Sequence, residues 1–170
     1  MKHAAPPPNK FQADKPAQID AGARLFLWAF RMIAEHRHCD HPTLPMIKDC
    51  YRRFGIEAAA PLLDALVDAF FHTAHTPIAI HSAGCPCVSD EEEFLLRAMA
   101  AAQLRDAGVA QRQFERWLPA QAAEWVLDPI CEVGRLFRAA GLAFGPRNPV
   151  RAATAQADEH TWAVVSRALH

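Results

Sequence analysis

Two cysteines separated by one residue, Cys85 and Cys87, lie in the stretch HSAGCPC and are the side chains of this chain best suited to chemistry. His81 lies four residues before the first of them. Thiolates and imidazoles are typical zinc ligands in proteins. Gly84 leaves the backbone free to turn and Pro86 restricts it, so this short segment can present both sulfur atoms to one metal ion.

A helix expected just before this stretch carries two further candidate ligands, His72 and His75. Side chains three residues apart on a helix point to the same side. Structural zinc sites usually take all four ligands from the protein. We therefore predict a closed zinc site formed by Cys85, Cys87 and two of the histidines His72, His75 and His81. Zinc binding would contribute on the order of 10 kcal/mol in favour of the folded chain.

The same two cysteines support a second hypothesis, a thiol redox protein or redox sensor. A disulfide between Cys85 and Cys87 would close a small ring, so it would be strained and easily reduced. The helix expected to begin at Ser89 favours thiolates just before it through its dipole, but the acidic run at 90–93 opposes them. The redox hypothesis therefore does not include a strongly activated thiol.

A third hypothesis, a metalloenzyme, rests on the polar side of the helix before the loop. Asp64, Asp68, His72 and His75 lie along one stripe of that helix, although a solvated face explains the same pattern. The chain has no phosphate-binding loop, nucleophile elbow or His-Glu-x-x-His motif. The sequence therefore favours a regulatory or partner-binding protein over an enzyme.

More potential ligands lie where the first expected helix ends, in the stretch EHRHCDH, which contains His36, His38, Cys39 and His41. Histidines near the end of a helix interact favourably with the negative end of its dipole, which explains them without a metal. Cys39 or His41 would be able to join a zinc site if the first and third helices packed side by side.

The composition indicates one globular domain in the cytoplasm. The chain has 170 residues, 51% of them hydrophobic, and a formal charge of -1, which gives no general attraction to nucleic acid. Its longest strongly apolar run, at 25–30, is far shorter than the roughly 20 residues of a membrane span. The N-terminal residues have no apolar segment typical of a secretion signal. The five cysteines are therefore expected as thiols or metal ligands, and a partner, if any, as another protein.

Hydrophobic periodicity predicts an all-α fold, a bundle of about six helices with a long loop carrying Cys and His between the third and fourth. Residues 1–18 are expected as an extended or disordered lead, and 19–170 as a single domain. The predicted helices span about 20–38, 44–54, 57–75, 89–106, 109–117, 119–140 and 158–169, with a strand as the alternative for the last.

Individual residues define several ends and faces of these helices. Ser89 and Glu92 have the spacing of a capping box, and Gly55 suits the left-handed end of the second helix. Pro129 is expected to kink one long helix and not to divide it. In the first helix Arg24, Arg31, Glu35 and His38 form a narrow polar arc, and the core is expected to hold the aromatic residues Phe26, Trp28, Phe30, Trp117, Trp125 and Phe137.

Overall fold

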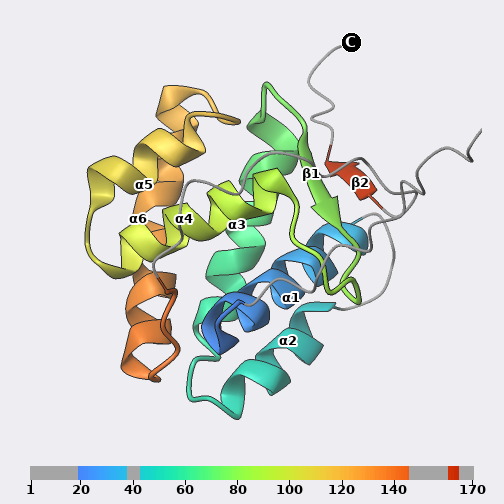
Figure 1. Ribbon diagram of the computed structural model, residues 1–170, viewed down its shortest axis with the longest axis vertical. Helices are drawn as coiled ribbons and strands as arrows, with labels where there is room; N and C mark the ends of the chain where they lie inside the picture. The colour runs from blue at the N-terminus through green and yellow to red at the C-terminus, as the bar shows by residue number, and fades with distance from the viewer. Residues whose placement is uncertain (1–18, 38–42, 146–160, 165–170) are drawn as a thin grey trace, which may run out of the picture.

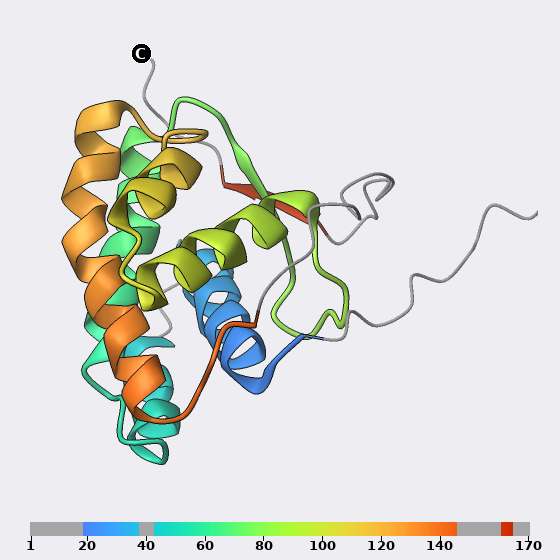
Figure 2. The same ribbon diagram turned by 60° about the vertical axis from the view of Figure 1, so that its left-hand side comes forward.

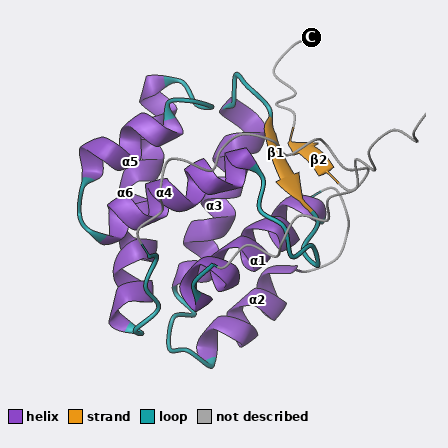
Figure 3. Cartoon of the chain, in the orientation of Figure 1, coloured by secondary structure: helices purple, strands orange, loops and turns teal. Residues whose placement is uncertain are grey.

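A computed structural model describes residues 19–37, 43–145 and 161–164, and the fold in these ranges is an all-α bundle, as predicted. The described helices are α1 (Ala21–Glu35), α2 (Thr43–Arg52), α3 (Ala59–Thr73), α4 (Asp90–Gln103), α5 (Ala107–Phe114) and α6 (Ala120–Ala139). Two short strands, β1 (Ile78–His81) and β2 (Thr161–Val164), complete the described elements (Figure 3). The expected lead at 1–18 and the residues His38, Cys39 and His41 lie outside the described ranges.

The helices pack around α3 and α4. Helix α3 contacts α1, α2 and α6. Helix α4 contacts α5, α6 and strand β1. The strands therefore lie on the side of the molecule away from α5 and α6 (Figures 1 and 2). Within the described ranges, no helix is both long enough and apolar enough to cross a membrane.

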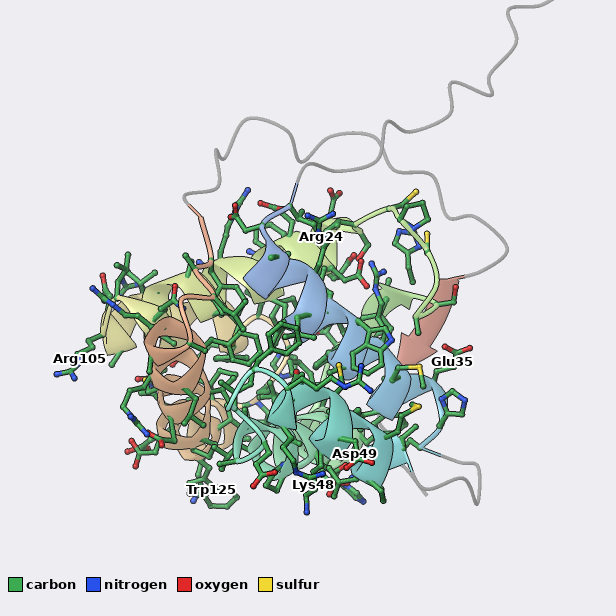
Figure 4. All side chains as sticks on the ribbon, turned by 90° about the horizontal axis from the view of Figure 1, so that it is seen from below. Arg24, Glu35, Lys48, Asp49, Arg105 and Trp125 are labelled. Atoms are coloured by element: carbon green, nitrogen blue, oxygen red, sulfur yellow. The ribbon has the colours of Figure 1, made fainter. Side chains whose placement is uncertain are left out.

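Aromatic side chains make up much of the core. The ring of Phe70 lies 5.9 Å from that of Phe30 and 5.7 Å from that of Trp117, centroid to centroid, with both pairs near the edge-to-face geometry that aromatic rings favour. Trp125 does not belong to this core, contrary to the sequence-based expectation. Its side chain is 66% exposed and points outward from the bundle (Figure 4).

Several helix ends follow the sequence signals. The hydroxyl of Ser89 accepts a hydrogen bond from the backbone N–H of Glu92, whose carboxylate in turn accepts from the N–H of Ser89, so the predicted capping box is confirmed. Gly55 has a φ of 70°, the left-handed conformation expected of it. Asp20 stands at the start of α1, but its carboxylate accepts from the N–H of Gly145, 2.7 Å away, and so ties distant parts of the chain together.

Two predictions about the second half of the chain have opposite outcomes. Helix α6 runs without a break through Pro129, as expected. The final helix predicted at 158–169 is wrong within the described residues and the strand given as its alternative is confirmed, because Thr161–Val164 form strand β2. This strand pairs antiparallel with β1, with Ile78 opposite Val164 and His81 opposite Thr161. The backbone pairing offered by β1 is a tertiary contact that helical periodicity in the sequence does not reveal.

One core side chain carries a polar atom without a partner, and this leads to a first prediction. The Tyr51 side chain is fully buried, and its hydroxyl finds no hydrogen-bond partner among the described residues. Burial, with a smaller contribution from Cys50, raises the pKa of the phenol, so the group stays neutral. We expect Tyr51→Phe to leave the free energy of unfolding in urea unchanged or to raise it, because no hydrogen bond is lost.

Tyr51→Ala is the matched control, since it removes the ring that packs edge-to-face on Phe137. It should lower the free energy of unfolding by about 3–5 kcal/mol. A loss in Tyr51→Phe approaching that of Tyr51→Ala would show that the hydroxyl has a stabilising partner.

Candidate functional site

The loop that holds Cys85 and Cys87 connects β1 to α4 and has a defined backbone. The N–H of Cys85 donates to the carbonyl of Ser82 at 3.0 Å, which closes a turn. The N–H of Cys87 donates to the sulfur of Cys85 at 3.4 Å, so this sulfur lies against the backbone of the second cysteine. Both cysteines are half-buried and neither forms a disulfide, whereas Gly84 and Pro86 are exposed.

The guanidinium of Arg31 holds this loop from inside. Arg31 lies on the predicted polar arc of α1, but it is only 4% exposed. Its Nη1 donates to the carbonyl of Cys85 at 2.7 Å, and its Nη2 donates to the carbonyl of Cys87 at 2.6 Å. The guanidinium is planar and has several N–H donors, so it can donate hydrogen bonds to two carbonyl groups at once. Both cysteines are therefore positioned through their backbone carbonyls.

The charge of Arg31 is balanced by Glu92, which is completely buried in the first turn of α4. Arg31 Nε and Nη2 donate to the two carboxylate oxygens of Glu92 at 2.6 and 2.7 Å, a bidentate ion pair. The same oxygens accept from the backbone N–H groups of His81, at 3.1 Å, and Ser89, at 2.9 Å. One carboxylate therefore joins α1, the end of β1 and the start of α4.

Two more hydrogen bonds attach the loop to its surroundings. The Ser89 hydroxyl donates to the carbonyl of Ala79 in β1 at 2.8 Å, in addition to its role as a helix cap. Glu35, one turn after Arg31 on the same arc, accepts from the N–H of Ala83 at 3.2 Å. Glu35 lies at the end of α1 nearer the strands, opposite the end that carries Arg24 (Figure 4). Two residues of the polar arc, Arg31 and Glu35, therefore contact the cysteine loop, a partner that sequence reasoning missed.

The acidic residues at the start of α4 oppose a thiolate less than their sequence suggests. Glu92 is paired with Arg31, and Glu93 lies 3.7 Å from the Nε of Arg97. Two of the four negative charges therefore have a cationic partner, which reduces their repulsion of a nearby negative sulfur. Spacing along the chain did not indicate the Arg31–Glu92 pair, because its two residues are sixty-one positions apart.

The five residues of the predicted zinc site, His72, His75, His81, Cys85 and Cys87, are not gathered into one group. Among the residues that the structure describes, no three His, Cys, Asp or Glu side chains are placed to share a metal ion. His72 is exposed at the end of α3, where its Nδ1 lies 2.8 Å from the carbonyl of Asp68. His81 differs from it, because its Nδ1 is buried and has no hydrogen-bond partner in the described part of the chain.

Asp64 and Asp68, the carboxylates of the predicted metalloenzyme site, are both paired with one arginine. Arg37, just after α1, donates to Asp64 at 2.7 Å and also forms an ion pair with Asp68. Helices α1 and α3 do pack side by side, the condition under which Cys39 or His41 was expected to approach a site. His36 turns its Nδ1 toward the carbonyl of Met32, 3.0 Å away, within α1.

The remaining described cysteines, Cys50 and Cys131, lie outside this loop. Both are half-buried. Burial, and to a lesser extent the nearby charge of Asp128, raises the pKa of the Cys131 thiol, so less of it is thiolate at neutral pH. Cys131 is therefore an internal reference for a thiol of low reactivity.

Comparisons with known proteins do not assign this site. The chain matches no protein-family model, and neither a curated protein nor a solved structure shows significant similarity to it. The features that bear on function are therefore the geometry of the cysteine loop and the Arg31–Glu92 pair that contacts it.

We predict that Arg31 and Glu92 depend strongly on each other. Arg31→Met leaves a buried carboxylate without its cation, and Glu92→Leu leaves the opposite charge unpaired, so each should lower the free energy of unfolding by about 3–5 kcal/mol. The double variant should lose less than the sum of the two single losses. Urea denaturation of the four proteins measures this coupling.

The exposed pair Glu132 and Arg135 on α6 provides the control. Arg135→Met should change stability little, because solvent screens that pair. Additive losses for Arg31→Met and Glu92→Leu would contradict the dependence.

Proposed function

We propose that the protein is a small helical regulatory protein that senses oxidation through the thiol pair Cys85 and Cys87. The observation that carries this proposal is the hydrogen bond from the N–H of Cys87 to the sulfur of Cys85, which keeps that sulfur beside the second cysteine. Further support comes from Arg31, which binds the backbone carbonyls of both residues and so fixes the loop that carries the two thiols.

The proposed reaction is thiol–disulfide exchange with a small disulfide such as oxidised glutathione. One cysteine of the pair loses its proton to water, and the thiolate attacks the S–S bond of the reagent, releasing one glutathione and forming a mixed disulfide. The other cysteine, also deprotonated, attacks the protein sulfur of that mixed disulfide and releases the second glutathione. Two protein thiols are oxidised to one disulfide, and one glutathione disulfide is reduced to two thiols. The small strained ring favours easy reversal.

The test is intact-mass and peptide-mass measurement of untagged protein after incubation with oxidised glutathione. We expect loss of two hydrogen atoms, located in the peptide that contains Cys85 and Cys87. Cys85→Ser should abolish this intramolecular product, whereas the matched variant Cys131→Ser should retain it. Cys131 itself should be modified slowly at pH 7 and faster as the pH rises, since its pKa is raised by burial.

Two outcomes would contradict the redox function. One is that both loop thiols remain unmodified under conditions in which an exposed control thiol reacts. The other is a stable glutathione adduct on either residue that never resolves to the internal disulfide. In both cases the two sulfurs would not act as a pair.

A second candidate function is zinc binding, which one further observation supports. The Nδ1 of His81 is buried without a hydrogen-bond partner among the described residues, and an imidazole nitrogen in that state is able to bind a metal. Because no three His, Cys, Asp or Glu side chains are placed to share a metal ion in the described structure, zinc binding would have to move the loop, bringing Cys85, Cys87 and His81 together. The fourth ligand would be His72 or His75.

Elemental analysis of protein purified without an affinity tag distinguishes the two candidates. The zinc site predicts close to one equivalent of zinc, and its loss together with marked destabilisation in Cys85→Ser. His72→Ala and His75→Ala, compared with the wild type, identify the fourth ligand. Less than about a tenth of an equivalent of zinc, with unchanged stability of Cys85→Ser, would exclude the site.

A further inference from the structure

We propose that the edge of β1 is a strand-binding surface whose occupant, β2, is released when Cys85 and Cys87 form a disulfide. This inference rests on the proposed redox function and names its structural output. It connects two features that are far apart in the sequence, the cysteine loop and the strand at Thr161–Val164.

The pairing of β2 with β1 is weak enough for another extended segment to replace β2. The sheet has two strands of four residues each, and a two-stranded sheet of this length has little stability of its own. Within the described chain, β1 is the only element that β2 contacts extensively, whereas β1 also packs against α4. The stability of the sheet therefore depends on how firmly β1 is held in place. An edge that loses its partner strand is open to another extended segment.

The end of the cysteine loop binds the edge of β1 that does not pair with β2. Ala79 and His81 alternate with the buried residues Ile78 and Ile80 along the strand. The carbonyl of Ala79 accepts from the hydroxyl of Ser89, and the N–H of His81 donates to Glu92. Both contacts come from the capping box of α4, at the end of the cysteine loop. The position of β1 is therefore tied to Glu92 and, through it, to Arg31.

Disulfide formation changes the contacts of Arg31 directly. The ring closed by a Cys85–Cys87 bond contains the peptide groups between the two residues, including the carbonyl of Cys85. The Cys85 sulfur must also leave the N–H of Cys87 to reach the second sulfur. Closing the ring turns the peptide group that carries the Cys85 carbonyl away from Nη1 of the guanidinium, and a buried donor left unpaired is costly. Arg31 and Glu92 shift to recover partners, and the contacts of Glu92 and Ser89 with β1 weaken.

Hydrogen–deuterium exchange of the full-length untagged protein, read by mass spectrometry, tests this link. The reduced protein is compared with protein oxidised by oxidised glutathione, and the disulfide is verified by mass in the same sample. We expect the amides of 78–81 and 161–164 to exchange at least about tenfold faster after oxidation, with those of α6 unchanged. Cys85→Ser treated in the same way should show no acceleration.

The outcomes separate this inference from the redox function on which it rests. A verified disulfide with unchanged exchange in β1 and β2 would overturn strand release and leave the redox function intact. Failure to form the disulfide would overturn both, and the mass measurement alone would reveal it. Faster exchange throughout the chain would indicate general unfolding and also overturn specific release.

A pair of capping variants tests the same link in the reduced protein. Ser89→Ala removes both the cap of α4 and the hydrogen bond to Ala79, so exchange in 78–81 should accelerate. Asp106→Ala is the matched control, because Asp106 caps α5 by accepting from the N–H of Val109 at 3.1 Å and does not bind β1. Equal effects of the two variants on β1 would overturn the proposed coupling.

Discussion

The buried ion pair between Arg31 and Glu92 is the interaction on which this side of the molecule depends. Two charged groups with exposures of 4% and 0% are stable inside a protein only if their hydrogen-bonding capacity is filled. The carbonyls of Cys85 and Cys87 satisfy the cation, and the N–H groups of His81 and Ser89 satisfy the anion. The loop, a strand and two helices therefore share one set of contacts.

Such a pair is weak evidence for stability, because apolar side chains of similar size often stabilise a core equally well. It does specify geometry, since Arg31 has directional donors and Glu92 directional acceptors. The rest of the bundle is held by aromatic and aliphatic packing around residues such as Phe70. We infer that the ion pair serves mainly to hold Cys85 and Cys87 in one conformation, with their sulfurs left half-buried.

The arrangement connects chemistry at the two sulfurs to the backbone around them. Arg31 holds the cysteines by their carbonyls, so a reaction that reorients those carbonyls reaches a buried charge directly. Glu92 transmits the change because it also binds the end of β1. Oxidation and zinc binding would both act on this loop, although only oxidation requires the two sulfurs to bond to each other. The physical route from loop to strand is the same in either case.

The sequence by itself determined the helical fold, the capping box at Ser89 and the continuity of α6 through Pro129, because each depends on neighbours a few residues apart. It also singled out Cys85 and Cys87 as the side chains best suited to metal binding or thiol chemistry. Tertiary structure alone decided that Arg31 and Glu35 contact the loop, that Arg31 is buried against Glu92, and which of the two alternatives, helix or strand, holds at Thr161–Val164. Those outcomes depend on residues brought together from distant positions, and local periodicity contains no information about such contacts.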